Sequence, residues 1–137
     1  MGLILDSTVL VAAEREGKNA RKLLKDISGN TGDTEVAISV LTLVELAHGA
    51  ARANTAERKE KRLQFIEELI TALPVHPITV AIALRAGQVD GQCRAQGVQI
   101  PLTDLLIGVT ALELGYGLAT ENSRHFRLIP GLSISSL

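Results

Sequence analysis

Short apolar runs alternate with longer helical patterns along the whole chain, and this alternation restricts the possible folds more than any other feature. Apolar runs bounded by turn residues occupy positions 2–5, 36–40 and 117–120, and each is short enough to be a strand buried on both faces. Helical patterns cover residues 8–16, 20–27, 42–53, 58–72, 79–96 and 103–114, and several of them end at a glycine. The sequence therefore predicts a layered α/β fold in which a central parallel sheet has helices on both faces.

Two shorter segments complete the predicted order of elements. Residues 74–77 can form a short segment between two helices, and residues 132–135 alternate like a final edge strand. No internal repeat or interdomain linker interrupts the pattern, and 137 residues are enough to bury one core without a disulfide or a structural metal. We therefore predict a single domain over residues 1–137.

Composition excludes several classes of protein. No apolar run approaches the roughly 20 residues of a membrane span, and the first ten residues lack the basic region and cleavage pattern of a signal peptide. The single cysteine cannot form an internal disulfide, and the three histidines are scattered, so any metal must be held by oxygen. We expect a soluble, cytoplasmic protein without a membrane partner.

The overall charge limits how the chain can meet nucleic acid. A formal net charge of −1 provides no general basic field, so any contact with RNA must be local. Aromatic residues make up only 2% of the chain, which argues against a base-stacking platform and hence against a pure RNA-binding module.

Asp6 is the first candidate functional residue. It closes the first apolar run, and ligands of open α/β sheets gather outside the carboxyl ends of the strands, where the strand order reverses. An equally good explanation is that Asp6 caps the helix that begins near Thr8. Asp6 taken alone leaves both interpretations open.

Glu45 lies one turn into the helix that follows the second predicted strand, among apolar neighbours, where a carboxylate needs a partner. The spacing of Thr42 and Glu45 also fits a capping box, in which the glutamate bonds to the backbone amide of the N-cap residue. In isolation, the capping box is the better interpretation of this pair.

Asp104 is expected at the start of a helix that is apolar on all sides, with Thr103 as its N-cap. Acids are common in a first helical turn because they complement the helix dipole. That preference does not explain why three acids occupy three predicted strand-to-helix junctions on one edge of the sheet. Converging carboxylates repel one another unless a cation joins them, and such oxygen ligands favour Mg²⁺, with Mn²⁺ as the alternative.

Three segments resemble the motifs of a known family. LILDSTVLVAAE is similar to the opening of PIN domains, AISVLTLVELAHG to their second acidic segment, and IPLTDLLIGVTALELGYGLATENSRHFRLIPGL to their C-terminal signature. The motifs occur in the expected order over nearly the whole chain, and their style is closest to VapC-type ribonuclease toxins of bacterial toxin-antitoxin systems. The resemblance implies a PIN-like three-layer fold and a Mg²⁺- or Mn²⁺-dependent endoribonuclease. The implied partners are RNA, a VapB-like antitoxin and a second copy of the chain in a homodimer.

By the same resemblance, Asp6, Glu45 and Asp104 are the metal ligands, and Asn122 occupies a fourth catalytic position where many relatives have aspartate. An amide oxygen attracts a divalent ion less strongly than a carboxylate, and Asn122 also suits an Asx turn. Thr120 and Ser7 are implied as helpers that orient the ion.

Other polar residues carry weaker signals. His125 is more typical of packing or a surface turn than of a general base, and we leave it out of the predicted site. Basic residues on either side of the acids could meet phosphates, whereas the mixed-sign run 57–62 is typical of a solvated helix face. The basic residues are Arg15, Lys18, Arg21, Lys22, Arg124 and Arg127.

Two rival functions remain. A haloacid dehalogenase-like phosphatase also has a first strand that ends in aspartate, but its second aspartate is absent here because position 8 is threonine. A degenerate PIN module that binds RNA or an antitoxin without cleaving is favoured by Asn122 and opposed by the three retained acids.

Overall fold

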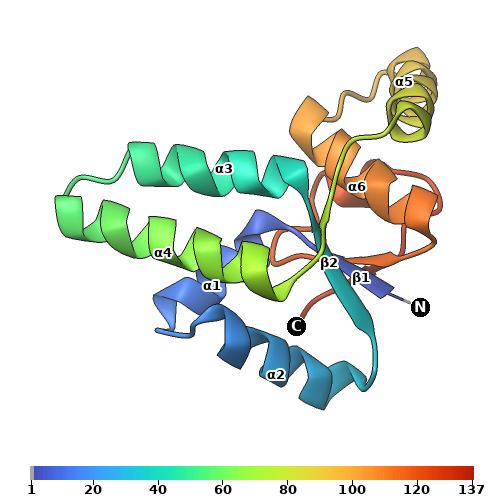
Figure 1. Cartoon of the computed structure of the whole chain (residues 1–137). Coiled ribbons are helices and arrows are strands. Elements are labelled where there is room, and N and C mark those ends of the chain that lie inside the picture. Colours follow the sequence, from blue (N-terminus) through green and yellow to red (C-terminus); the bar gives the residue numbers. More distant parts are fainter. Residues whose placement is uncertain (1) are drawn as a thin grey trace.

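The computed structural model describes residues 2–137, in which five parallel strands form one sheet with helices on both faces (Figure 1). The strands are β1 (Gly2–Leu5), β2 (Glu35–Ser39), β3 (Val75–His76), β4 (Gly117–Ala119) and β5 (Ile134–Ser135). The helices are α1 (Ser7–Arg15), α2 (Ala20–Thr31), α3 (Val40–Ala51), α4 (Ala56–Ala72), α5 (Val80–Ala95), α6 (Leu102–Leu114) and the short 3-10 helix η1 (Phe126–Leu128). The predicted α/β fold is confirmed, and the expected short segment at 74–77 contains an edge strand.

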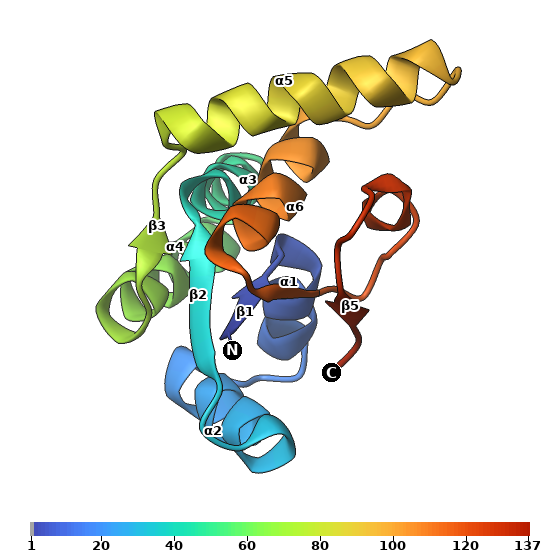
Figure 2. The same ribbon diagram turned by 90° about the vertical axis from the view of Figure 1, so that its right-hand side faces the viewer.

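The strand order is β3-β2-β1-β4-β5, so the chain moves outward from β1 in one direction and later returns to its other side. Figure 2 shows β3, β2, β1 and β5 side by side in this order. The order of connection therefore reverses between β1 and β4, which is the position where open parallel sheets place their ligands.

The register of the three inner strands explains the two layers of core. Ile4 pairs with Ala37 on β2 and with Leu118 on β4 in the same row across the sheet. These three residues belong to the apolar cluster that includes α5, α6 and η1. The next row consists of Leu5, Ile38 and Ala119, which face the cluster of α1, α2 and α4. Because strand side chains alternate, a continuous apolar run supplies both layers.

Helices α3 and α4 lie against each other and extend away from the sheet as an arm (Figure 1). Arg62 of α4 fixes the arm to the rest of the domain. Its guanidinium donates to both carboxylate oxygens of Glu14 on α1, at 2.7–2.9 Å, and to the Leu46 carbonyl oxygen at 3.3 Å. Gly49 leaves room for this guanidinium, since a Cβ at that position would collide with it. The last residue of the run 57–62 is therefore half-buried, and the prediction that this run is a solvated face is wrong for Arg62.

Several predicted helix boundaries differ from the structure. Helix α2 continues past Gly29 and ends at Gly32, whose φ of 73° is the left-handed conformation that favours glycine. Helix α3 begins two residues earlier than predicted, because Ser39 supplies the cap by accepting from the Leu41 N–H at 3.1 Å. None of the helices within residues 2–137 is both long and apolar enough to cross a membrane.

Candidate metal centre

Asp6 and Thr120 lie at the carboxyl ends of β1 and β4, on either side of the point where the strand order reverses. The Asp6 N–H donates to the Ala119 carbonyl oxygen at 3.1 Å, which continues the pairing of the two strands by one residue. The Thr120 hydroxyl donates to Asp6 Oδ2 at 2.7 Å. The ends of the two strands are thus joined through the Asp6 side chain.

Asp6 also caps α1, as the first alternative predicted. Its Oδ1 accepts from the backbone N–H groups of Thr8 at 3.0 Å and Val9 at 3.4 Å, and from the Thr8 hydroxyl. The capping role and the functional position are therefore compatible. The Asp6 side chain is almost fully buried, and this burial raises the pKa of its carboxyl group, although the bonds from Thr120 and Thr8 oppose the shift.

Thr8 was not recognised from the sequence as part of this site. Its hydroxyl contacts Asp6 and Thr120 and accepts the Glu121 N–H at 2.9 Å, so it connects α1 with the segment after β4. The spacing of two residues between Asp6 and Thr8 was the available signal, because a hydroxyl in a first helical turn can reach the cap.

Glu45 does not form the capping box, so that interpretation is wrong. Ser39 is the N-cap, and Thr42 lies inside the first turn, where its hydroxyl is buried and has no hydrogen-bond partner among residues 2–137. Burial raises the pKa of Glu45, and the negative charges of Asp104 and Asp6 raise it further, while a hydrogen bond from Ser7 lowers it. Glu45 therefore faces the start of α1 and lies within electrostatic reach of the other two acids.

Asp104 occupies the first turn of α6, but its position in the fold differs from the prediction. The preceding element is α5, so Asp104 lies at a helix-to-helix junction, and the N-cap is Pro101 rather than Thr103. The helix can begin immediately after Pro101, whose carbonyl oxygen accepts the Leu105 N–H at 2.9 Å. Because α6 leads directly into β4 and runs antiparallel to it, the start of α6 returns to the carboxyl edge of the sheet.

His125 contacts Asp104 directly, which sequence reasoning did not anticipate. Its Nδ1 lies 2.8 Å from Asp104 Oδ2, and both side chains are partly buried. The residues are 21 positions apart, so no local motif indicated the contact. A histidine that donates to a carboxylate restricts the directions in which that carboxylate can point.

The side chain of Asn122 is used in a turn. Its Oδ1 accepts from the Arg124 N–H at 3.4 Å, and its own N–H donates to the Thr120 hydroxyl oxygen at 3.0 Å. This is the Asx-turn alternative that the sequence left open. Asn122 is exposed and lines a surface groove together with Ser7 and Thr8.

The three acids approach one another without forming a ready-made ion cage. In residues 2–137, no three His, Cys, Asp or Glu side chains converge closely enough to hold a metal ion. Much of the carboxylate capacity is engaged in hydrogen bonds, since Thr8 and Thr120 donate to Asp6 and His125 contacts Asp104. The donor set nevertheless fits a hard divalent cation. Such an ion prefers oxygen ligands, and it relieves the repulsion between neighbouring carboxylates.

The raised pKa of Glu45 predicts how metal and charge affect stability. The pKa of the Glu45 carboxyl is higher in the folded than in the unfolded chain. The metal-free protein therefore loses stability as pH rises from the pKa of the unfolded state through that of the folded state. At pH 7, Glu45→Gln should therefore melt at a higher temperature than wild type in EDTA, and should gain less from added Mg²⁺. Thermal melts with and without Mg²⁺ measure both effects, with Glu60→Gln as an exposed control on α4. A lower melting temperature of Glu45→Gln in EDTA would contradict the prediction.

The chain is similar to known proteins in sequence and in fold. The PIN domain family profile matches residues 3–132. Ribonuclease VapC1 of Rickettsia felis is 31% identical over 134 residues, which cover 98% of this chain and 95% of the relative. Ribonuclease VapC10 of Mycobacterium tuberculosis is 36% identical over 130 residues, which cover 95% and 90% of the two chains.

A solved structure extends the match to three dimensions. The crystal structure of VapBC2 from Rickettsia felis, bound to a DNA fragment from its promoter, superimposes with a TM-score of 0.84. The match covers 100% of this chain and 99% of that chain, at 21% identity, and it shows a common fold. The chain belongs to the PIN domain family. The resemblance inferred from the three sequence motifs is thereby confirmed.

Proposed function

We propose that this chain is a VapC-type endoribonuclease that uses a divalent cation, Mg²⁺ or Mn²⁺, held by Asp6, Glu45 and Asp104. The observation that carries the proposal is the position of the three acids, which belong to a PIN domain and share one edge of the sheet. Burial raises the pKa of Glu45, and the charges of Asp104 and Asp6 add to that shift. A scaffold without catalytic function has no need to concentrate negative charge where a phosphate must bind.

The surrounding residues prepare the acids for this role. Thr8 and Thr120 fix the Asp6 carboxylate, Ser7 bonds to Glu45, and His125 limits the rotation of Asp104. When bound, a divalent cation would orient the phosphodiester, favour deprotonation of water and stabilise the charge of an in-line displacement. The burial of Asp6 excludes bulk water from one side of the site, which strengthens every charge interaction there.

Cleavage of a labelled structured RNA in Mg²⁺, in Mn²⁺ and in EDTA tests the proposal. We expect product in both metals and none in EDTA. RNA binding without cleavage in either metal would instead support the degenerate PIN module.

Asn122 is neutral, whereas the other three proposed site residues are acids, so its replacement by aspartate is informative. Aspartate can keep the turn bond to the Arg124 N–H, while it adds an anionic oxygen to the groove that contains Ser7. We expect Asn122→Asp to lower the Mg²⁺ concentration for half-maximal cleavage. An unchanged Mg²⁺ titration would restrict Asn122 to its role in the turn.

Two protein partners belong to the same proposal. The VapBC complexes among the structural matches support a VapB-like antitoxin as a partner. A homodimer is compatible with the apolar side chains exposed on α5 and α6, where Val80, Leu84 and Leu102 are 78%, 67% and 69% exposed. An apolar surface of this kind commonly marks a protein–protein contact.

A further inference from the structure

A groove beneath the α3–α4 arm carries the positive charge that the chain lacks as a whole. We call it the basic trough; it has a volume of about 480 Å³. Its lining residues are Val11, Glu14 and Arg15 of α1, Gly49 of α3, Ala53 of the α3–α4 connection, and Arg58, Lys61 and Arg62 of α4. Four of these side chains are cationic and one is anionic.

The anion in the trough is already paired, so the net excess of three positive charges lies on side chains that do not contact Glu14. Glu14 forms a salt bridge with Arg62 at 2.7 Å, and both side chains are largely buried. Arg15, Arg58 and Lys61 remain. Within residues 2–137, Arg15 forms no salt bridge, and the Arg58 guanidinium donates only to the Asn54 side-chain oxygen, at 3.2 Å.

Lys61 can also be released for a ligand at little cost. Its ion pair with Glu57 spans 3.4 Å, and both side chains are more than 70% exposed. Exposed pairs of this kind contribute little to stability, so a phosphate can compete with the glutamate.

The basic trough adjoins a second groove, beside Ser7 and Thr8. That second groove is lined by Ser7, Thr8, Val11, Ala12, Arg15, Glu121 and Asn122, and it shares Val11 and Arg15 with the trough. Ser7, Val11 and Arg15 are four residues apart and form one stripe along α1. The stripe begins at the residue that bonds to Glu45 and ends in the trough, about 12 Å away at a rise of 1.5 Å per residue.

Helix α3 provides the opposite side of the same path. Glu45 and Gly49 are also four residues apart, and Ala53 follows at the same spacing just beyond the end of α3. Gly49 and Ala53 line the trough, and the Arg62 guanidinium packs against Gly49. The basic trough therefore lies beside the proposed metal ligands, because Gly49 of the trough is one helical turn after Glu45 on α3.

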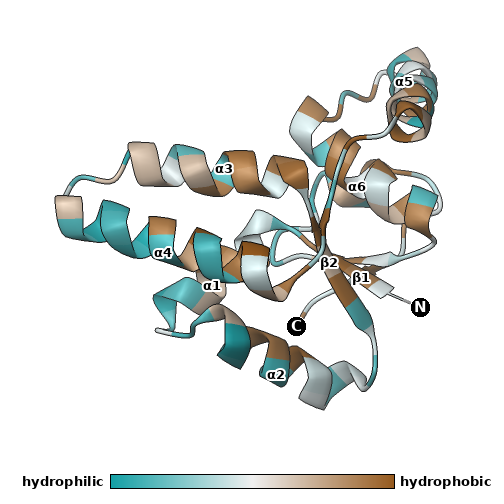
Figure 3. Cartoon of the chain, in the orientation of Figure 1, coloured by the Kyte–Doolittle hydropathy of each residue, from teal (hydrophilic) through white to brown (hydrophobic). Residues whose placement is uncertain are grey.

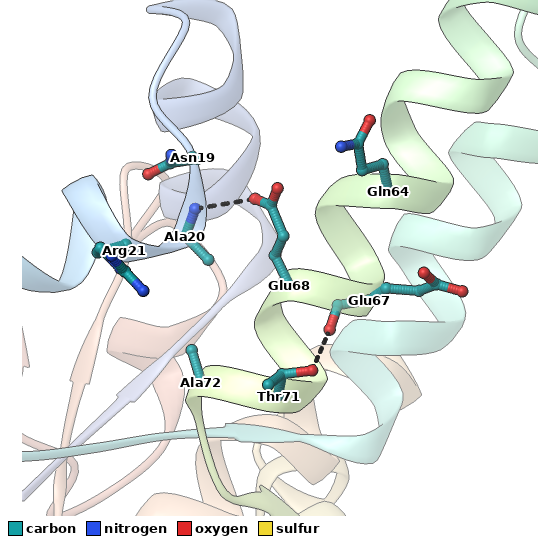
Figure 4. Close-up of a pocket in the computed structure, with 8 residues that line it drawn as sticks. All are labelled: Asn19, Ala20, Arg21, Gln64, Glu67, Glu68, Thr71 and Ala72. Atoms are coloured by element: carbon teal, nitrogen blue, oxygen red, sulfur yellow. Dashed lines mark hydrogen bonds between the residues drawn. The ribbon is translucent and has the colours of Figure 1, made fainter.

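Two other surface grooves within residues 2–137 do not have this charge. The groove between α2 and α4 contains Arg21 with the two acids Glu67 and Glu68, and Glu68 is bonded to the Ala20 N–H at the start of α2 (Figure 4). The groove between α5 and α6 is apolar, and its one ionisable side chain is Asp90. Figure 3 shows that α4 is largely hydrophilic, in contrast to the part of α3 nearest the sheet.

We propose that the basic trough binds the single-stranded RNA next to the phosphate that is cleaved, with Arg15, Arg58 and Lys61 contacting backbone phosphates. The proposal deepens the ribonuclease function and rests on it for the position of the cleaved bond. It also explains how a chain of net charge −1 can bind an anionic polymer, because the attraction is confined to the basic trough. Phosphate contacts position the strand without reading its sequence.

The test compares two triple variants with the same change in charge. Arg15→Gln/Arg58→Gln/Lys61→Gln alters the trough, whereas Arg21→Gln/Lys25→Gln/Lys59→Gln alters three exposed cations outside it. Binding of a fluorescent single-stranded oligoribonucleotide is measured by anisotropy in EDTA over a range of salt concentrations. Thermal melts confirm that both variants are folded.

Log affinity falls with log salt, and we expect this slope to be about 2 less steep for the trough variant than for wild type. Each of the three lost phosphate contacts to a single strand contributes about 0.7 to the steepness. Its affinity at 0.1 M salt should fall by about one to two orders of magnitude, while the control stays near wild type. Equal slopes for the two variants, or a wild-type protein that does not bind the oligoribonucleotide, would overturn the proposal. An acidic peptide serves as a second probe. If the trough variant binds this peptide less well but binds RNA as wild type does, the proposal is overturned and the trough is assigned to a protein partner.

Cleavage separates this proposal from the proposed function. If wild type binds RNA through the trough but does not cleave it in Mg²⁺ or Mn²⁺, the ribonuclease assignment fails and the trough remains an RNA-binding surface. If wild type cleaves RNA and the trough variant keeps both its salt slope and its KM, the function stands and the trough proposal fails.

Discussion

Asp6→Asn should abolish RNA cleavage while the chain remains folded, with a rate loss of at least about 100-fold. The substitution removes a formal negative charge from the proposed metal ligands, and several kcal/mol of transition-state stabilisation by a bound cation correspond to two or more orders of magnitude in rate. The fold should tolerate the change because asparagine is also a good N-cap, and its oxygen can accept the Thr8 and Val9 N–H groups.

Single-turnover cleavage of a labelled RNA in saturating Mg²⁺ is the measurement for Asp6→Asn. Asp90→Asn is the matched control, because it also removes one aspartate charge but belongs to an exposed ion pair with Arg94 on α5. Cleavage by Asp6→Asn at the wild-type rate would remove Asp6 from the site. An equal loss in both variants would indicate a general effect of charge.

Phe126→Ala should have the largest effect on stability, about 3–5 kcal/mol. Phe126 is 2% exposed in the cluster that includes α5 and α6, and it packs against α6 beside Gly108. For a domain of this length, such a loss corresponds to a fall in melting temperature of roughly 10–20 °C. The variant should also cleave RNA more slowly at temperatures where it is folded, because the preceding residue is His125, which contacts Asp104.

Thermal or urea unfolding measures this effect, and Leu128→Ala is the control on the same 3-10 helix. Leu128 is 42% exposed, so its truncation should cost much less than that of Phe126. Similar losses for both variants would mean that η1 is held by something other than the burial of Phe126.

The acids could be found from the sequence because each is fixed by a short local pattern next to an apolar run. Asp6 follows a strand and caps a helix, and both facts are visible within a few residues. Asp104 was expected at the start of its helix, but its junction was misassigned, because no apolar strand separates the helical pattern 79–96 from the pattern 103–114. The edge on which it lies was still right, since α6 and β4 are joined by two residues and must run antiparallel.

The contacts that sequence reasoning missed connect residues far apart in the chain. His125 and Asp104, and Arg62 and Glu14, meet only after the sheet has assembled. A mixed-sign run such as 57–62 has the same local pattern whether its last arginine is solvated or half-buried against another helix. The choice between two caps failed for a related reason: Ser39 and Thr42 are both good capping residues, and the end of β2 decides which one is used.

Because β4 lies beside β1, the centre of the sheet is complete only after β4 has been translated. The first strand is at the centre of the sheet, and one of its two neighbours is a strand that ends at residue 119 of 137. A ribosome that has translated the first hundred residues has produced Asp6 and Glu45 but neither Asp104 nor Thr120, and domains fold as units once their chain is complete. If Asp6, Glu45 and Asp104 hold the cation as we propose, a translation product that stops before β4 lacks part of the proposed centre and cannot cleave RNA.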